Sequence, residues 1–333
     1  MLGGASSERD VSLASGFRVV DALRSAGHRV LALDPVTGVL RPSEELALRA
    51  SGMKAEPPSL EALARLGGTR LRELSPSVVM LPEVREADVV FLALHGGQGE
   101  DGTVQAMLDS VGVPYTGSGH LASALAMDKD LSKILFRASG VGTADWLMAP
   151  ATDADVERTL GFPVVVKPSK QGSTVGLSVV RDRHALQSAI VTAYQYDDEV
   201  MIERFIPGRE LTVGVLGSDA LPVGEIFPQH EIYDYECKYT TGMAREEFPA
   251  RLTPEESATM QDQALRAFRA LKLRGYARID FRLDPAGEMY CLEANTLPGL
   301  TELSLIPQAA AVHGLGFVQL CERILALAVH ASE

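Results

Sequence analysis

The sequence predicts a mixed fold in which a doubly wound α/β domain is followed by a two-part region of α+β character. Helix and strand periodicities alternate over the first 117 residues, whereas the later strand patterns are separated by polar, glycine-bearing loops. The length of 333 residues also exceeds what one hydrophobic core usually serves. We therefore expect three units, at residues 1–117, 118–200 and 201–333.

The first unit has the pattern of a Rossmann-like domain. A helix is predicted over residues 11–26, a strand over 28–33 and a short helix at 60–66. A nearly continuous apolar run at 87–94 is typical of a buried parallel strand, and it leads into the glycine-rich turn 95–102. Strand, helix, strand, turn and helix in this order favour a doubly wound sheet.

The same patterns predict the elements of the other two units. They are a helix at 128–138, strands at 162–168, 176–180, 211–216, 221–227, 278–283 and 288–295, and a helix beginning after Thr253. That last helix is well defined, because Thr253, Pro254 and Glu256 form a capping box with proline in the first turn.

Composition narrows the class of protein. The net charge is −13 and the basic residues are scattered, so we expect no nucleic-acid partner. The three cysteines form no Cys-x-x-Cys pair, which argues against a disulfide framework or a zinc site and for a reducing cytosol. We see no apolar run long enough for a membrane helix and no signal peptide, and therefore expect a cytoplasmic protein that binds no membrane.

The strand patterns at 278–283 and 288–295 carry the strongest chemical signal. Alternation places three side chains of each strand on one face, namely Arg278, Asp280 and Arg282 in the first and Cys291, Glu293 and Asn295 in the second. If the strands pair as a hairpin, Asp280, Glu293 and Asn295 converge, although the register cannot be read from the sequence. Two carboxylates and an amide oxygen suit Mg²⁺. The alternative is a solvated strand face with alternating charges.

Other segments are weaker signals taken singly. The small-residue loop at 167–176 contains Lys167 and can cradle phosphate oxygens, but it lacks the ending of a Walker loop and resembles an ordinary hairpin connection. The segment 203–210 can supply adenine and ribose contacts or be a surface turn. The polar stretch 233–252 is a lid or a disordered loop. His95 and Glu8 have structural readings as well, as a core histidine and a helix-start carboxylate.

Together these segments resemble the D-alanine–D-alanine ligases of the ATP-grasp superfamily. The resemblance runs through nearly the whole chain in the same order, at residues 3–13, 94–102, 114–118, 127–129, 167–176, 233–239 and 293–299. It implies an N-terminal substrate-binding domain followed by a two-part ATP-grasp fold, with the phosphate loop in the central unit and the lid and metal site in the C-terminal one.

The resemblance also implies roles for individual residues. Contacts with ATP are implied for Lys129, Lys167 and Lys238 at the phosphates, Glu203 and Ile206 at the adenine, and Glu210 at the ribose. Two Mg²⁺ or Mn²⁺ ions are implied at Asp280, Glu293 and Asn295. Contacts with the two D-alanines are implied for Glu8 and His95 at the first, for Ser304 and Leu305 at the carboxylate of the second, and for Arg278 and the Gly299 N–H at the oxyanion. A hydrogen-bonded triad is implied for Glu8, Ser173 and Tyr239.

The implied activity is ATP-dependent formation of D-alanyl-D-alanine through an acyl phosphate, for peptidoglycan precursor synthesis, by a homodimer. Tyr239 stands where relatives that make D-alanyl-D-lactate carry histidine, so D-alanine is the expected acceptor. Two departures are present. Thr174 replaces a usual serine, and only Met1 and Leu2 precede the Gly-Gly motif where relatives have a strand. Either the start is assigned late or the first sheet lacks most of a central strand, which bears on the position of Glu8.

Three competing functions remain open. The chain is alternatively an ATP-grasp ligase for another D-amino or D-hydroxy acid, a catalytically impaired ligand-binding relative, or a nucleotide-binding sensor. A binding protein has no need for metal ligands and an oxyanion arginine together, so Arg278 beside Asp280, Glu293 and Asn295 argues for an enzyme.

Overall fold

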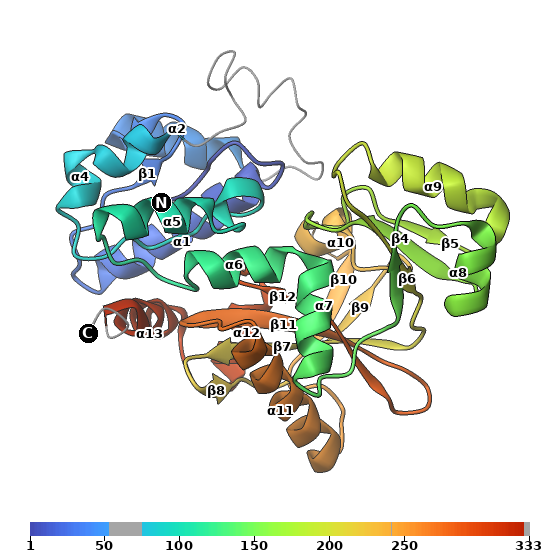
Figure 1. The fold of residues 1–333 in the computed structure, drawn as a ribbon. Helices are drawn as coiled ribbons and strands as arrows, with labels where there is room; N and C mark the ends of the chain where they lie inside the picture. The colour runs from blue at the N-terminus through green and yellow to red at the C-terminus, as the bar shows by residue number, and fades with distance from the viewer. Residues whose placement is uncertain (53–74, 241, 330–333) are drawn as a thin grey trace.

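The computed structural model describes residues 1–52, 75–240 and 242–329. Three regions surround the middle of the molecule, with the N-terminal domain in blue, a small sheet in green and yellow, and a larger sheet in orange (Figure 1). The helix predicted at 60–66 lies outside the described residues.

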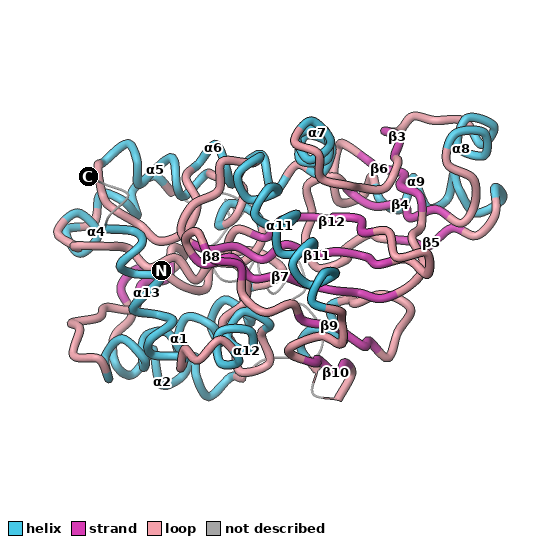
Figure 2. Tube along the Cα trace, turned by 90° about the horizontal axis from the view of Figure 1, so that it is seen from below, coloured by secondary structure: helices cyan, strands magenta, loops and turns pink. Residues whose placement is uncertain are grey.

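The larger sheet is antiparallel throughout. Its strands are β7 (Arg209–Leu216), β8 (Asp219–Ala220), β9 (Gly224–Pro228), β10 (Ala244–Glu247), β11 (Tyr276–Leu283) and β12 (Met289–Asn295). The order is β10-β9-β7-β11-β12, with β8 paired to β7, and the strands run side by side in Figure 2. Helix α11 (Pro254–Ala270) has the predicted capping box and buries Met260, Ala264 and Phe268 in the core that it shares with this sheet.

The smaller sheet has the order β3-β6-β4-β5. Its strands are β3 (Trp146–Met148), β4 (Val164–Pro168), β5 (Ser178–Val180) and β6 (Val200–Arg204), and its helices are α8 (Asp153–Thr159), η4 (Arg183–Ala185) and α9 (Leu186–Ala193). Val164, Val166 and Ile202 are fully buried against α8 and α9. The β4–β5 connection is therefore a loop of a well-packed hairpin, as predicted.

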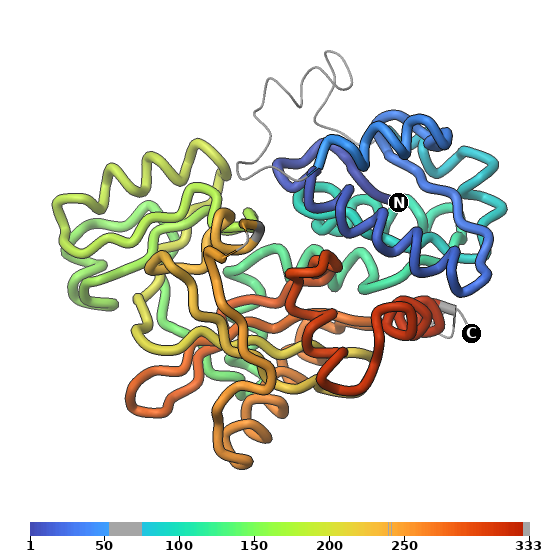
Figure 3. The backbone as a smooth tube through the Cα atoms, turned by 180° about the vertical axis from the view of Figure 1, so that it is seen from behind, coloured from blue at the N-terminus to red at the C-terminus, as the bar shows by residue number. Residues whose placement is uncertain are grey.

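Further helices lie beside these sheets. They are α6 (His120–Met127), α7 (Lys129–Ala138), α10 (Tyr235–Tyr239), α12 (Leu305–Val312) and α13 (Phe317–Val329). Contacts of α6, α12 and α13 link the larger sheet to the N-terminal domain. The last helix packs beside the first, α1 (Arg9–Ser25), so both ends of the chain lie on one side of the molecule (Figure 3). Leu320 and Ile324 of α13 are buried in the same core as Val19 and Leu23 of α1.

The N-terminal domain contains more helix than paired strand. Its remaining elements are β1 (Leu33–Asp34), β2 (Gly38–Val39), α2 (Pro42–Ser51), η2 (Pro76–Met80), α4 (Pro82–Arg85), η3 (Gly97–Gly99) and α5 (Thr103–Val111). The strand predicted at 28–33 is reduced to the start of β1, and the one at 87–94 to a single parallel bridge between Val90 and Tyr115. The two runs nevertheless lie on either side of one strand position.

Met1 and Leu2 occupy one end of that position. The Met1 ammonium donates to Phe91 O at 2.7 Å, Met1 O accepts from Ala93 N–H, and Leu2 N–H donates to Leu33 O. Alternating bonds to left and right are those of a central strand. Beyond Met1 the position continues as a groove of about 720 Å³ between residues 28–33 and 86–91.

Main-chain groups line this groove without partners. Among the described residues, the N–H and C=O groups of Leu31 and Val89 have no hydrogen-bond partner in the protein, and the Leu31 side chain is 56% exposed. In the part of the chain that the structure describes, Met1 pairs with the run at 86–91 and Leu2 with the run at 28–33.

None of the described helices is by itself both long and apolar enough to cross a membrane. The bent pair Leu305–Val312 and Phe317–Ala328 meets that criterion only when the two helices are taken together.

Candidate active site

The β11–β12 hairpin builds one wall of the site. Asp280 pairs with Glu293 and Arg278 with Asn295, so the three predicted metal ligands converge. In β11, the alternation is as predicted, because Ile279 and Phe281 are fully buried on the opposite face.

One face assignment in β12 was wrong. Cys291 was expected beside Glu293, but it is fully buried in the core and pairs with Phe281. A register irregularity between Asp280 and Phe281 makes Leu292 the extra residue, and an extra residue reverses the alternation beyond it. Leu292 therefore faces the pocket instead of Cys291.

Asp280 is held from three directions. Arg278 donates from Nε to Oδ1 at 2.9 Å and from Nη2 to Oδ2 at 2.8 Å. The Thr212 hydroxyl donates to Oδ1 at 2.7 Å, and the Asn295 amide donates to Oδ2 at 3.0 Å. Burial alone would lower the pKa of Arg278, but Asp280 outweighs it and raises that pKa above its usual value. The Arg278 guanidinium is therefore charged.

Glu293 is an ionised carboxylate beside a lysine. Its Oε2 lies 3.3 Å from Lys129 Nζ. Burial would raise the pKa of Glu293, but Lys129, Lys238 and other cations lower it to about 2. Two anionic carboxylates facing each other with an amide oxygen adjacent form an all-oxygen donor set that fits Mg²⁺ or Mn²⁺.

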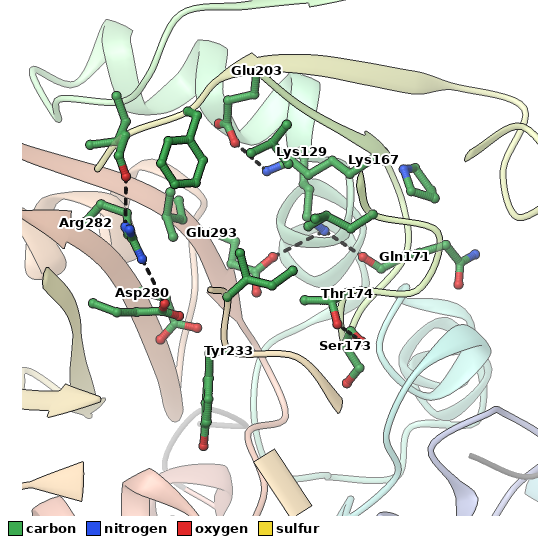
Figure 4. A pocket seen from close by; sticks show the side chains of 18 of the residues that line it. Lys129, Lys167, Gln171, Ser173, Thr174, Glu203, Tyr233, Asp280, Arg282 and Glu293 are labelled. Atoms are coloured by element: carbon green, nitrogen blue, oxygen red, sulfur yellow. Dashed lines mark hydrogen bonds and ion pairs between the residues drawn. The ribbon is translucent and has the colours of Figure 1, made fainter. Parts of the chain in front are cut away.

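A pocket opens above this wall, between the two sheets (Figure 4). Predicted residues that line it are Lys129, Lys167, Ser173, Glu203, Ile206, Glu210, Lys238, Asp280 and Glu293. They come from α7, β4, β6, β7, α10 and the hairpin, which are far apart in the sequence. The structure thus brings all six predicted ATP contacts and two predicted metal ligands into one cavity.

Glu203 ties two lysines together at the inner end of the pocket. It accepts hydrogen bonds from Lys133 and, at 2.7 Å, from Lys167. Glu203 is 3% exposed; burial would raise its pKa, but the two lysines lower it to about 2. The anion fixes Lys167 with its ammonium on the pocket wall, where a phosphate can compete for it.

Arg282 holds two groups at the end of the pocket away from the β4–β5 loop. Its Nη1 donates to Glu210 Oε2 at 3.1 Å and its Nε donates to Ile206 O at 3.1 Å. Glu210 has a raised pKa because burial outweighs Arg282. A carboxylate next to an apolar wall is suited to a ribose hydroxyl.

The loop between β4 and β5 is held in an uncommon conformation. Ser173 and Thr174 have φ values of 51° and 59°, which residues other than glycine rarely adopt. Lys129 Nζ donates to Gln171 O at 2.8 Å, and the Ser173 hydroxyl donates to Glu8 Oε1. The loop therefore connects the pocket to the N-terminal domain.

Glu8 and His95 form the other side of the site. Glu8 is the N-cap residue of α1 and is 8% exposed. His95 Nε2 lies 3.2 Å from Ser15 Oγ, which also accepts from Leu300 N–H at 3.1 Å. Burial lowers the pKa of His95 and Glu8 opposes this, so the ring is neutral near pH 7.

The segment 299–305 closes this side. A Cβ atom on Gly299 would lie 2.6 Å from Ser304 Oγ, so only glycine allows this approach. Ser304 Oγ accepts from Thr301 N–H at 3.0 Å, and Leu305 begins α12. The first N–H groups of a helix without a side-chain cap suit a carboxylate.

The sequence analysis missed two residues of the site, and the side chain of one predicted residue, Tyr239, cannot be placed. The side chain of Tyr239 lies outside the described residues, so its part in the predicted triad stays a prediction. Lys133 was missed, although it is four residues after Lys129 on the same helix face. Glu100 was also missed; its Oε2 accepts from Gly96 N–H at 2.8 Å, and burial together with Glu8 raises its pKa to about 8.

Comparison with known proteins gives consistent matches. Family profiles described as D-ala D-ala ligase N-terminus and D-ala D-ala ligase C-terminus match residues 1–118 and 135–326. The D-alanine–D-alanine ligase of Synechococcus sp. (strain JA-2-3B'a(2-13)) is 42% identical over 332 residues, covering 98% of this chain and 90% of the relative. That of Geobacter sulfurreducens is 42% identical over 329 residues, covering 98% and 92%.

Solved structures agree. The D-alanine–D-alanine ligase from Bacillus anthracis superposes with a TM-score of 0.74 at 31% identity, covering 99% of this chain and 96% of that one. A structure of the enzyme from that organism complexed with ATP gives a TM-score of 0.67 at 33% identity, covering 78% and 84%.

Proposed function

Because the chain belongs to the D-alanine–D-alanine ligase family, we propose that it is an ATP-dependent ligase that forms D-alanyl-D-alanine for peptidoglycan precursors. The observation that carries the proposal is the facing pair Asp280–Glu293 beneath a pocket whose other walls hold Lys129, Lys167 and Lys238. Anionic metal ligands opposite three cations are the arrangement that phosphoryl transfer requires.

The reaction divides into two steps. The carboxylate of the first D-alanine attacks the γ-phosphorus of ATP, which forms D-alanyl phosphate and releases ADP. The amine of the second D-alanine then attacks the acyl carbon, the peptide bond forms, and phosphate leaves with the electrons of the C–O bond. Two Mg²⁺ or Mn²⁺ ions held by Asp280, Glu293 and Asn295 would neutralise charge on the phosphates.

The chain's own residues position the substrates. We assign Lys129, Lys167 and Lys238 to the phosphates because they line one cavity. We assign Glu203 and Ile206 to the adenine and Glu210 to the ribose, because all three line the same cavity. The low pKa of Glu203 keeps it ionised, so it holds Lys167 in place before ATP binds.

The two D-alanines are assigned to the other side. Glu8, oriented by Ser173, faces the ammonium of the first D-alanine, and neutral His95 lies beside it. Arg278 and the Gly299 N–H are assigned to the oxyanion that forms during attack. Ser304 Oγ and the Leu305 N–H receive the second carboxylate, and Tyr239 completes the triad with Glu8 and Ser173.

Phosphate release from ATP tests the proposal. We expect release with D-alanine alone and none with L-alanine, and D-alanyl-D-alanine as the product by mass spectrometry. Release only when D-lactate accompanies D-alanine would overturn the choice of acceptor. No release in any mixture would favour the impaired, ligand-binding alternative.

Three finer points belong to the same proposal. We infer a homodimer, a cytoplasmic location and Mg²⁺ or Mn²⁺ as the metal. Light scattering of the purified protein tests the first, and metal replacement in the phosphate-release assay tests the third.

A further inference from the structure

A second group of metal-ligating side chains lies on the segment that joins β9 to α10. His230, Asp234 and Cys237 each direct one ligand atom into a common volume, and these atoms lie within 4.8 Å of one another. No other group of three His, Cys, Asp or Glu side chains this close occurs among the described residues. None of the three belongs to the set assigned to ATP, D-alanine or Mg²⁺.

The local structure explains why the three atoms meet. Asp234 is the N-cap of α10: its Oδ1 accepts from Cys237 N–H at 2.9 Å, which leaves Oδ2 directed elsewhere. That Oδ2 lies 2.7 Å from His230 Nδ1. Cys237 is a free thiol and 2% exposed, so its sulfur is fixed by packing beside Ile226 and Leu305.

The group is open to solvent on the side of His230 and Asp234. The His230 side chain is 40% exposed and Asp234 29%, so a cation and its remaining water ligand have access from solvent.

The chemistry of the ligands selects the cation. Thiolate, imidazole and carboxylate together suit Zn²⁺, whereas Mg²⁺ prefers oxygen ligands alone. Zinc bonds of about 2.0–2.3 Å place tetrahedral ligand atoms roughly 3.3–3.8 Å apart, which is within the 4.8 Å that bounds the separations here. We propose that His230, Asp234 and Cys237 form a Zn²⁺ site with water as the fourth ligand. The sequence argument against a zinc site considered only cysteine pairs, and it missed this group because two of the three ligands are not cysteines.

Binding changes the lid that carries a phosphate contact. The next residue after Cys237 is Lys238, which lines the pocket. Helix α10 has only five residues, too few to be stable alone, and the ion ties its first turn to the preceding segment. Resting on the proposed ligase function, we infer that Zn²⁺ restrains α10 and slows turnover, because product release from an enclosed pocket requires the segments around it to move. The thiol proton, and the imidazolium proton where present, pass to solvent.

Metal titration tests the site itself. Chelator-treated protein in saturating Mg²⁺ is titrated with Zn²⁺ against a colorimetric chelator, and with Cd²⁺ while thiolate-to-metal absorption is followed in the ultraviolet. We expect one equivalent of Zn²⁺ and a Cd²⁺ absorption band. His230→Gln and Cys237→Ala are expected to weaken binding by at least about 10-fold, and the band disappears in Cys237→Ala.

Matched variants keep the test specific. Cys321→Ala removes a buried thiol of α13, and His313→Gln removes a histidine after α12; both are expected to bind Zn²⁺ as the unmodified chain does. His230 is exposed, so its variant folds and remains informative if Cys237→Ala does not. Absence of stoichiometric Zn²⁺, or binding unchanged in both site variants, overturns the proposal.

Activity separates the site from the lid effect. One equivalent of Zn²⁺ is expected to slow phosphate release by the unmodified chain and not by His230→Gln. Binding without any change in rate would refute the effect on the lid and leave the site. A protein that binds Zn²⁺ through these residues but forms no D-alanyl-D-alanine would refute the ligase function instead.

Discussion

The large sheet and the N-terminal domain supply opposite halves of the same site, and they differ in how completely their strands are paired. In the sheet, β11 is paired along its length with β7 on one side and β12 on the other. In the N-terminal domain, the comparable runs at 28–33 and 87–94 hold a two-residue strand and one bridge. The half that carries Asp280 and Glu293 is therefore fixed by main-chain pairing, whereas the Glu8 and His95 half depends on a few side chains.

Those side chains are identifiable. Arg9 lies 2.5 Å from Asp34, with exposures of 5% and 0%, and Arg9 Nη1 also donates to Gly4 O. Ser12 Oγ accepts from Gly3 N–H and donates to Ala93 O. These bonds substitute for a strand ladder, so the Glu8 and His95 half can lose its geometry while the Asp280 and Glu293 half keeps its own.

Breaking the Arg9–Asp34 pair is expected to have the largest effect. Arg9→Met leaves Asp34 buried and unpaired, which costs about 3–5 kcal/mol of unfolding free energy. Because Arg9 follows Glu8, KM for D-alanine is expected to rise in whatever protein remains folded. Denaturant unfolding and phosphate-release kinetics measure the two effects.

The control is an arginine of the same domain at the surface. Arg24 pairs with Glu45 but is 40% exposed, so Arg24→Met is expected to cost no more than about 1 kcal/mol. Equal losses from both variants would show that the buried pair does not replace strand pairing.

The second prediction concerns the well-paired sheet. Arg278→Lys keeps a positive charge beside Asp280 but loses the planar fork, so kcat is expected to fall ~100- to 1,000-fold with the fold intact. Arg282→Lys, two residues along the same face, is the matched variant; it contacts Glu210 and Ile206, and KM for ATP is expected to change more than kcat. Kinetic constants and thermal unfolding distinguish the cases, and a KM-only effect of Arg278→Lys would exclude its oxyanion role.

The face of β11 was predictable from sequence because two-residue alternation needs only local information. The shared face of Arg278 and Asp280 follows from it, whereas their convergence with Glu293 and Asn295 also depends on the hairpin register, which only the structure gives. The extra residue at Leu292 was not predictable, since a bulge depends on which residues the partner strand presents. The apolar run 87–94 correctly indicated burial, but its pairing depends on chain that is not adjacent to it.

The third prediction sharpens the contrast by filling the groove. A four-residue apolar extension joined to Met1 is expected to pair with the free groups of Leu31 and Val89. Two to four added hydrogen bonds stabilise by about 1–3 kcal/mol in total. Thermal unfolding measures this gain, and a Gly-Ser extension of equal length is the control. Equal melting temperatures for the two extensions would mean that the groove does not accept a strand.

The smallest expected effect is on the pH dependence of stability. Burial lowers the pKa of the Met1 ammonium to about 5, and Asp34 opposes this. The unfolded chain then binds more protons between about pH 5 and 8, so this group makes stability rise with pH across that window. Glu100, with its pKa raised to about 8, binds more protons when folded and makes stability fall over nearly the same window.

The two contributions therefore offset each other, and removing one exposes the other. Glu100→Gln is expected to make stability rise between pH 5 and 8, by at most about 1.4 kcal/mol per pH unit. Acetylation of the Met1 amine is expected to produce a fall instead. Unfolding free energies at several pH values measure both slopes, and the same slope in both proteins would contradict the assignment.

The packing of α13 against α1 has a consequence for the order in which the protein can fold. Leu320, Cys321 and Ile324 complete the core that contains Val19 and Leu23, yet a ribosome makes them some three hundred residues later. The apolar face of α1 that packs against α13 therefore stays uncovered until α13 has been synthesised. Among the described residues, the core of the smaller sheet contains none from α13, so that sheet is free to form during synthesis, whereas Leu216 and Tyr276 of the larger sheet share their core with α13.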